Sequence, residues 1–440
     1  MTDKAVLPKT FRRLWAASAV SALGDGAYLA ALPLIAASMT HDPVVLSLVA
    51  AAARLPWLLF GLIGGALVDR WDRRRTMWIA DLARSVLLVV AAVGAATGLI
   101  GIPLLIVLAF LLCLGQIMFD TATTAYLPEL LDREPELLQR GNARLFATQT
   151  AANGFAGPPL GAALFSVGRT VPLVADAVSF LFSALVIRSL PKTPPRPVPR
   201  RRSVLAEARE GAAYLFRDPL LLGLSLRPAF GNLAFAAGEA VFVLFVKDEL
   251  HLGPATYGML LTAEAAGGLA GSAVARWLGD RLGRGVALTL APALATCSQV
   301  ALGLSNNAWT AGAAMVLCGA SVGTMIVLAS SIRQAVVPDH MMGRVASCAR
   351  LMSMGSVPLG ALLGGYLATT LGLRAPYLIG AGFLIVTTLL SATVTTNRRI
   401  DAALAKAAAD RQEEAAETAA QAKTEAEVPE SVGRPNDPQG

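Results

Sequence analysis

The sequence predicts an all-α polytopic membrane protein, and the first two observations behind this prediction are its composition and its long apolar runs. Of the 440 residues, 55% are hydrophobic and only 15% are charged, and the mean hydropathy is +0.58. A soluble domain of this length cannot hide so much apolar surface, so the chain needs a bilayer. A third observation, an internal repeat, predicts two copies of one membrane unit.

Twelve apolar runs are each long enough to cross a hydrocarbon core of about 30 Å at about 1.5 Å per residue. Helices are the expected form because a helix satisfies its backbone polar groups internally, whereas a membrane barrel would have short alternating strands. The runs lie near residues 14–37, 44–68, 76–97, 103–126, 143–166, 171–189, 220–246, 256–278, 286–304, 309–330, 345–369 and 376–396.

The repeat is clearest at the end of the second run. The stretch GLIGGALVDRWDRRR at residues 61–75 is matched in its apolar part by GLAGSAVARWL at residues 268–278. At the same offset, the Gly-Asp pair at residues 24–25 falls on Gly-Asn at residues 231–232. We therefore expect two pseudo-symmetric six-helix bundles.

A linker and a tail complete the predicted organisation. Residues 191–202 repeat proline at short intervals and cannot continue a helix, so they form an extended basic connector, and a short amphipathic helix then lies along the headgroups. Residues 400–427 have helical propensity without an apolar stripe, and residues 428–440 have the composition of disordered segments. The predicted units are a first bundle at 1–190, the linker at 191–219, a second bundle at 220–397 and a cytoplasmic tail at 398–440.

Basic residues predict the orientation. Most loop Lys and Arg residues fall on the side of the N-terminus and the linker, whereas the opposite side offers Arg169, Lys247 and Arg374. Positive charge marks the cytoplasmic side, so both termini are expected in the cytoplasm of a multi-pass protein of the cytoplasmic (inner) membrane. The formal net charge of +7 reflects this asymmetry near anionic headgroups and does not predict nucleic-acid binding.

Enzymatic function is not expected from the motifs. The sequence has no phosphate-binding glycine loop with its lysine and no His, Asp or Glu cluster with metal-ligand spacing. A membrane-embedded transferase would need carboxylate-rich motifs for magnesium and diphosphate, and none is present. The histidines His41, His251 and His340 fall in or beside loops and are interpreted as solvated.

Ionisable residues deep in the predicted spans are costly in hydrocarbon and therefore indicate function. Asp25 lies about 18 Å below the outer end of the first span, and Arg54 lies about 15 Å below the outer end of the second. The two residues can pair. Such a pair either acts in transport, by contacting substrate or by breaking on protonation, or is a purely structural salt bridge.

The second half offers different candidates. Glu239 and Glu264 lie about 10–14 Å below the outer surface in the seventh and eighth spans, and Arg227 lies about 18 Å from Glu239 along the same helix. A low-dielectric environment favours the neutral form of a carboxyl group. We hypothesise that Glu239 or Glu264 binds the coupling proton or the positive end of a substrate. The alternative is that both glutamates are water-exposed rim residues. The charge of the substrate also stays open, because Glu239 and Glu264 favour a cation whereas Arg54 and Arg227 favour an anion.

Several motifs in order along these spans carry a resemblance. Over roughly residues 10–396 the chain resembles transporters of the major facilitator superfamily, in particular the branch with enterobactin-type siderophore exporters and macrolide efflux pumps. The motifs are Gly24-Asp25, Gly65-x-x-x-Asp69-Arg70-x-x-Arg73-Arg74, Asp81-x-x-Arg84, Gly157-Pro158-x-x-Gly161, Glu210-Gly211-x-x-Tyr214-Leu215-x-x-x-Pro219, Gln334-x-x-x-Pro338-x-x-x-x-Gly343-Arg344 and Pro358-Leu359-Gly360. Two departures, Asp72 for a glycine and Arg276 for an acid, predict a weaker or differently built gate in the second half.

The resemblance implies a cytoplasmic gate after the second span. In it, Asp69 meets the positive N-terminal end of the eleventh helix, and Arg73 reaches Asp120, which is placed about 9 Å from the cytoplasmic end of the fourth span. The set, with Gly65, Arg70 and Arg74, would latch the outward-open state. The alternative is that these charges only set the topology.

Other positions carry simpler expectations. The two prolines at 158–159 in the fifth span remove backbone donors and bend the helix, while Gly157 and Gly161 permit tight contact. The resemblance implies that this element marks exporters, although such pairs also serve packing alone. Asp81 and Arg84 are one turn apart and are expected to satisfy each other, and Asp176, near the outer end of the sixth span, is expected to reach water.

The predicted function is proton-coupled export of an amphipathic small molecule, such as a drug, an antibiotic natural product or a siderophore, by alternating access of two bundles. The expected partners are the substrate, protons and the lipid bilayer, with a monomeric protein, no nucleic acid, and the proton motive force in place of a cofactor. The alternatives are a carrier that imports a small metabolite and a receptor or scaffold that does not transport.

Overall fold

The computed structural model describes residues 7–60, 71–192 and 204–426, and in these ranges the chain forms helices and short connections without a strand. The first half contains α1 (Lys9–Met39), α2 (Pro43–Ala52), α3 (Leu55–Phe60), α5 (Arg73–Thr97), α6 (Ile102–Leu130), α7 (Pro135–Thr150), the π-helix η1 (Ala151–Ala156), α8 (Gly157–Val167) and α9 (Val171–Arg188).

The second half follows a helix in the linker. It contains α10 (Val204–Arg217), α11 (Pro219–Glu239), α12 (Phe242–Leu244), the π-helix η2 (Phe245–Glu249), α13 (Pro254–Leu282), α14 (Arg284–Leu304), α15 (Ala308–Val336), α16 (Asp339–Leu371), α17 (Ala375–Ala392) and α18 (Asn397–Ala426). Among the described residues, eleven helical segments are long and apolar enough to cross a membrane. The predicted fifth span is built differently, from α7, η1 and α8 in succession.

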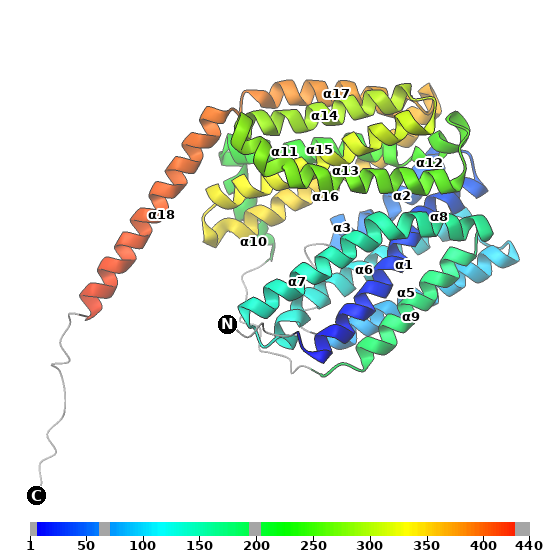
Figure 1. Ribbon diagram of the computed structural model, residues 1–440, viewed down its shortest axis with the longest axis horizontal. Coiled ribbons are helices and arrows are strands. Elements are labelled where there is room, and N and C mark those ends of the chain that lie inside the picture. Colours follow the sequence, from blue (N-terminus) through cyan, green and yellow to red (C-terminus); the bar gives the residue numbers. More distant parts are fainter. Residues whose placement is uncertain (1–6, 61–70, 193–203, 427–440) are drawn as a thin grey trace, which may run out of the picture.

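The helices form the two bundles that the repeat predicts (Figure 1). In the first bundle α1 packs against α8 and α9, and α5 packs against α6 and α9. In the second bundle α11 packs against α16 and α17, while α15 packs against α13 and α14. The all-α, two-bundle fold class is therefore confirmed.

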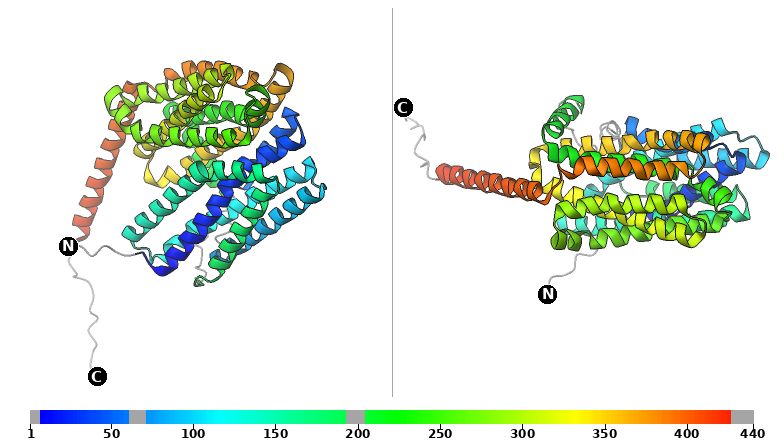
Figure 2. Two further views of the ribbon diagram at one scale, coloured as in Figure 1. Left: turned by 45° about the vertical axis from the view of Figure 1, so that its right-hand side comes forward. Right: turned by 90° about the horizontal axis from the view of Figure 1, so that it is seen from above.

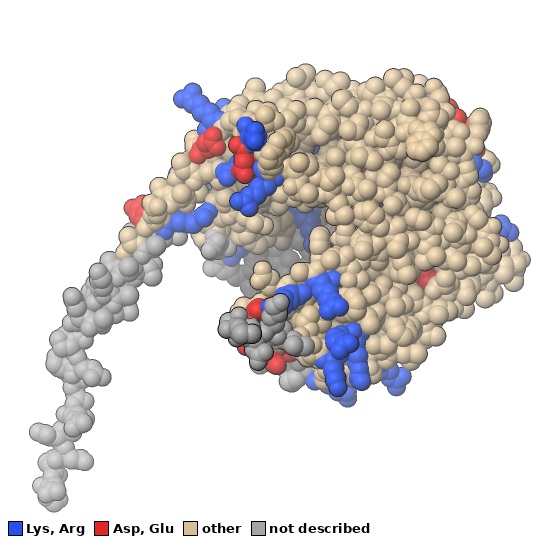
Figure 3. Space-filling view, in the orientation of Figure 1, with Lys and Arg blue, Asp and Glu red and all other residues tan. Residues whose placement is uncertain are grey.

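The bundles meet mainly at one end. The helix pairs α2 with α16 and α8 with α13 join the bundles. A Cβ atom on Gly365 would lie only 2.8 Å from the carbonyl oxygen of Pro43, and one on Gly258 would lie 2.7 Å from that of Pro158. These contacts lie where α1 ends and α13 begins. At the opposite end, where α1 begins, the surface is hollowed between the bundles (Figure 3).

The fifth span has the irregularity that its prolines predict. Pro158 and Pro159 have no N–H, and the turn immediately before them is the π-helix η1. The glycines serve close packing, since a Cβ on Gly157 would lie 2.5 Å from the backbone of Gly26, and one on Gly161 would lie 2.8 Å from the carbonyl carbon of Ala27. The predicted tight contact is confirmed, and its partner is α1.

The linker helix and the tail attach to the second bundle. The buried side chain of Leu215 on α10 belongs to that bundle's core, and Arg344 on α16 donates a 2.7 Å hydrogen bond to Glu210. Helix α18 confirms the predicted helical tail and extends away from the body (Figures 1 and 2). Its first residue, Asn397, accepts a hydrogen bond of 2.6 Å from the N–H of Gly285 at the start of α14. Residues 428–440 lie outside the described part.

Candidate functional site

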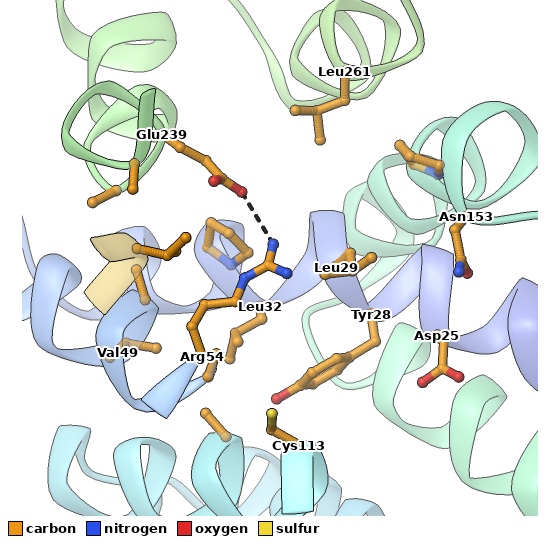
Figure 4. A pocket seen from close by; sticks show the side chains of 18 of the residues that line it. Asp25, Tyr28, Leu29, Leu32, Val49, Arg54, Cys113, Asn153, Glu239 and Leu261 are labelled. Atoms are coloured by element: carbon orange, nitrogen blue, oxygen red, sulfur yellow. Dashed lines mark hydrogen bonds and ion pairs between the residues drawn. The ribbon is translucent and has the colours of Figure 1, made fainter. Parts of the chain in front are cut away.

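A cavity of about 520 Å³ lies between the bundles and is lined by both of them. Most of its lining is apolar, with Leu29, Leu32 and Val49 on one wall and Leu261 on another (Figure 4). The charged lining residues are Asp25, Arg54, Arg84, Asp176, Glu239 and Glu264. A largely apolar cavity with a few fixed charges can bind an amphipathic molecule and orient its polar group.

Arg54 and Glu239 form an ion pair across the cavity. Arg54 lies in the break between α2 and α3, and its Nη2 atom is 3.4 Å from Oε1 of Glu239 at the end of α11 (Figure 4). Both side chains remain partly exposed, at 45% and 43%. Because one partner comes from each bundle, the pair depends on how the bundles are placed.

The predicted pairing of Asp25 with Arg54 is wrong, because Asp25 instead forms an ion pair with Arg84 on α5. Helix rise places Asp25 and Arg54 at similar depths in the membrane, but similar depth does not bring two side chains together when their helices face different neighbours. Arg84 also lies 3.4 Å from Asp81, so the predicted pairing of those two residues is confirmed.

Asp176 belongs to the same cluster as Asp25 and Arg84. It lies on α9, its residue is only 1% exposed, and it accepts a 3.0 Å hydrogen bond from the hydroxyl of Ser179. The expectation that it reaches bulk water is wrong, because α9 packs against α1 at Gly24, where a Cβ would overlap Asp176 and Ser179. Gly24, immediately before Asp25 in the first span, was the sequence signal for the close approach of α9 to α1.

Glu264 on α13 also faces the cavity and interacts electrostatically with Glu239 and Arg54. The part of the chain that the structure describes offers its carboxylate no hydrogen bond or ion pair. The proposed role of Glu264 and Glu239 in binding the proton or the substrate stays a prediction. Both residues line the cavity, as that role requires.

Arg227 does not line the cavity. It lies inside the second bundle, where its Nε donates to Ser391 at 2.9 Å and its Nη1 donates to the carbonyl of Leu288 at 2.6 Å. The residue is 6% exposed. Its inclusion among the substrate residues is therefore contradicted: Arg227 joins α11 to α14 and α17.

The predicted gate is only partly within the described residues. Gly65, Asp69 and Arg70 lie outside them. Arg73 forms its ion pair with Glu129, not with Asp120, because α6 continues to Leu130 and leaves Asp120 about 15 Å from that end.

The remaining gate residues bind within the first bundle. Asp120 accepts hydrogen bonds of 2.9 and 3.0 Å from Gln116, and Arg74 donates one of 2.5 Å to the carbonyl of Leu190.

Three further contacts join the bundles and were not predicted. At the end where the bundles meet, His41 in the loop before α2 lies 3.1 Å from Asp248 on η2, and its side chain is 65% exposed, in agreement with its interpretation as solvated. Lys247 donates to the carbonyl of Ala37 at 3.2 Å. The guanidinium of Arg350 on α16 lies 4.9 Å from the ring centre of Trp57 on α3.

Two helical bundles that meet at one end and line a shared, largely apolar cavity with a few fixed charges have the architecture of a polytopic membrane transporter. Residues 5–425 match the family described as transmembrane secretion effector, and the chain belongs to this family of the major facilitator superfamily. The predicted resemblance is thus confirmed at the level of the superfamily.

Two relatives are similar to nearly the whole chain. The multidrug efflux pump Tap of Mycobacterium tuberculosis is 27% identical over 402 residues, which cover 88% of this chain and 94% of Tap. The macrolide efflux protein A of Streptococcus pyogenes is 22% identical over 404 residues, which cover 89% of this chain and 97% of that protein.

Solved structures share the fold. A bacterial homologue of the iron transporter ferroportin in an inward-facing state matches 89% of this chain and all of its own, with a TM-score of 0.72 and 16% identity. The nucleoside transporter NupG matches 88% of this chain and 99% of its own, with a TM-score of 0.68 and 13% identity.

Proposed function

We propose that this protein exports an amphipathic small molecule across the cytoplasmic membrane in exchange for protons, as a monomer and without a cofactor. The observation that carries the proposal is the cavity shared by both bundles, largely apolar and crossed by the Arg54–Glu239 ion pair. The names of the Tap and macrolide relatives, both efflux proteins, favour export and a drug-like substrate.

The proposed orientation places both termini in the cytoplasm, as the basic residues predict. The cavity then opens to the cytoplasm, and the end closed by α2 with α16 and α8 with α13 faces outward. The predicted gate charges Arg73, Arg74 and Asp120 bind within the first bundle in this arrangement, as expected when a cytoplasmic latch is disengaged.

Export requires the outer ends of the bundles to separate. The Arg54–Glu239 pair joins the bundles, so it must break or lengthen in that step. A cationic group of the substrate near Glu239, or a proton on its carboxylate, would compete with Arg54 and release it. This is the same chemistry that the sequence predicts for Glu239 and Glu264, which can serve either the proton or the positive end of a substrate.

The test is substrate accumulation in a host that lacks its own efflux pumps. Cells expressing the protein are expected to accumulate less of at least one compound from a panel of antibiotics and dyes, and an uncoupler should remove the difference. The Arg54→Ala and Glu239→Gln variants should accumulate as much as cells without the protein, whereas Arg169→Ala, in an exposed loop, should behave as wild type. Equal accumulation with and without the wild-type protein across the panel would exclude export.

The same assay separates the alternatives. An importer would raise accumulation, and solved structures with this fold include a nucleoside transporter, although that likeness concerns the fold alone. A receptor or scaffold would leave accumulation unchanged in either direction. In the proton assay, the double variant Glu239→Gln, Glu264→Gln should abolish drug-linked proton movement, and unchanged coupling would remove both residues from that role.

A further inference from the structure

The first bundle contains a buried cluster of charged side chains to which the proposed export mechanism assigns no role. Its centre is Arg84, whose side chain is 3% exposed and forms ion pairs with Asp25 and Asp81. The guanidinium carbon lies 3.7 Å from the ring centre of Phe180, and a Cβ at Gly115 would lie 2.7 Å from the Arg84 side chain. The positive charge is therefore held in one place by contacts from several helices.

Asp176 adds a third carboxylate to this cation. It interacts electrostatically with both Asp25 and Arg84. One of its oxygens accepts from Ser179, and the other, Oδ2, is buried without a hydrogen-bond partner among the described residues. A buried carboxylate oxygen without a donor is unfavourable if the group is ionised, and it is a ready acceptor for a proton.

The charges of the cluster do not balance. Three carboxylates surround one guanidinium, so full ionisation would leave two uncompensated negative charges inside the bundle. The other arginine of the cavity, Arg54, pairs with Glu239 on the opposite wall. Burial of unpaired charge is unfavourable enough that such groups normally bind a compensating ion or a proton.

Access to the cavity distinguishes the three carboxylates. Asp25 and Asp176 line the cavity, and the side chain of Asp25 is 18% exposed. Asp81 is fully buried and pairs with Arg84, so it serves as the lasting partner of that cation. Asp25 is therefore the carboxylate of the cluster that is most open to the cavity, whereas Asp176 lines the cavity but is only 1% exposed and interacts electrostatically with Asp25.

From this geometry we infer that the cluster of Asp25, Asp81, Arg84 and Asp176 binds the coupling proton, which Asp25 and Asp176 share. The inference rests on the proposed function, places its proton site in the first bundle and leaves Glu239 and Glu264 to bind the positive end of the substrate. The proton enters from the cavity and adds to a carboxylate oxygen of Asp25 or Asp176, and it leaves by the same route. In the ionised form the cluster attracts a cationic substrate, and the proton weakens that attraction because it neutralises one of the two uncompensated negative charges.

Other titratable groups lie near the cluster, and a test of the proton site must distinguish their titration from that of Asp25 and Asp176. From α1 the phenol of Tyr28 interacts with Asp25, Arg84 and Asp176, and from α6 Cys113 and Asp120 interact with Arg84. The side-chain amide of Gln116 donates hydrogen bonds to the Asp120 carboxylate, so that carboxylate already has a donor outside the cluster.

Infrared difference spectra of the purified full-length protein between acid and alkaline pH test the site without a substrate. The wild type should have a band for protonated carboxyl groups that disappears at high pH. Asp25→Asn and Asp176→Asn should each lose part of this band, equivalent to about one carboxyl group between them, because asparagine has no carboxyl group to protonate. Asp280→Asn, an exposed carboxylate on α13, and Glu264→Gln should keep that part of the band. Asparagine at 176 can still accept from Ser179, and thermal melting checks that each variant is folded.

The outcomes separate this inference from the export proposal. If Asp25→Asn and Asp176→Asn both keep the full band, or if Glu264→Gln removes it instead, the proton site is not in the first bundle and this inference is wrong. If the spectra behave as expected and both asparagine variants also lose uncoupler-sensitive efflux, the inference is supported. If the wild type has no uncoupler-sensitive efflux, the export proposal fails independently of the spectra.

Discussion

The two bundles differ in where the charges that line the cavity find their partners. In the first, Arg84 pairs with Asp25 and Asp81 inside one bundle. In the second, Glu239 has no ion-pair partner among the described residues of its own bundle and pairs with Arg54 of the other. At the position that repeats Asp25, the neutral Asn232 donates to the carbonyl oxygen of Ser353 at 3.0 Å.

This difference indicates a division of roles. A pair within one bundle persists when the bundles rock, whereas a pair between bundles must change partners in each cycle. The core helices α14 and α17 of the second bundle support this view, because beyond the first residue of α14 they carry no charged side chain at all, while α5 and α9 carry Asp81, Arg84 and Asp176. We therefore expect the folding free energy to depend mainly on Arg84 and its ion pairs within the first bundle, and the movement of the bundles past one another to depend on the Arg54–Glu239 pair.

The largest effect on stability is expected at Arg84. The Arg84→Ala variant leaves Asp25 and Asp81 buried without their cation, which should cost about 3–5 kcal/mol of folding free energy. Thermal melting and the yield of monodisperse protein in detergent measure this loss. Adding Asp25→Asn and Asp81→Asn to Arg84→Ala should recover part of it, because the unpaired charges are then gone. A melting temperature for Arg84→Ala equal to that of wild type would show that the cluster does not stabilise the bundle.

The repeat supplies a matched pair of glycines for a second test. Gly24→Ala places a methyl group against Asp176 and Ser179 and should cost about 1–3 kcal/mol. At Gly231, its counterpart in the second bundle, a Cβ would meet no atom within 4 Å. Gly231→Ala should therefore be neutral or stabilise the helix by up to about 1 kcal/mol. Equal melting temperatures for the two variants would contradict the close approach of α9 to α1.

The pair between bundles should behave in the opposite way to Arg84. Both Arg54 and Glu239 are partly exposed, so Arg54→Ala should change folding free energy by less than about 1 kcal/mol. Its efflux rate should nevertheless fall about tenfold or more, a change in activation free energy of about 1.4 kcal/mol. Efflux and melting are measured on the same preparations. Loss of stability without loss of efflux would reverse the proposed division of roles.

The sequence predicts the fold and the local Asp81–Arg84 pair, but it does not predict the ion pairs between different helices. Continuous apolar runs and the repeat predict spans and bundles because each span is a local feature of the chain. Helix rise predicts the depth of Asp25 and Arg54 but not the direction in which each side chain points, and this direction decides that Asp25 meets Arg84. The partner of Glu239 depends on the placement of two bundles, which no local pattern encodes.

Wrongly predicted positions relative to the helix ends also led to wrong partners for charged residues. The fourth span was predicted to end at residue 126, and α6 in fact continues to Leu130, so Glu129 takes the partner expected for Asp120. Asp176 was placed near the outer end of its span and therefore near water, and only the packing of α9 against α1 at Gly24 buries it. Depth along a helix and contact across helices are separate quantities.

The smallest effect is expected at the end where the bundles meet. His41 and Asp248 form a surface pair between bundles, worth up to about 1 kcal/mol, so Asp248→Asn should shift the equilibrium between the two open states by up to about fivefold. The neighbouring Glu249 is a matched control, because its partner Arg374, 3.0 Å away, belongs to the same bundle.

Spin labels at positions 169 and 371, one on each bundle, report the separation of this end when the four native cysteines have been replaced. Asp248→Asn should increase the population with a long distance between labels, and Glu249→Gln should leave the distribution unchanged, because only the first variant removes a contact that joins the bundles. If both variants shift the distribution alike, the effect comes from the fold of η2 and not from the pair between bundles. The comparison of charges within and between bundles would then apply to the cavity alone.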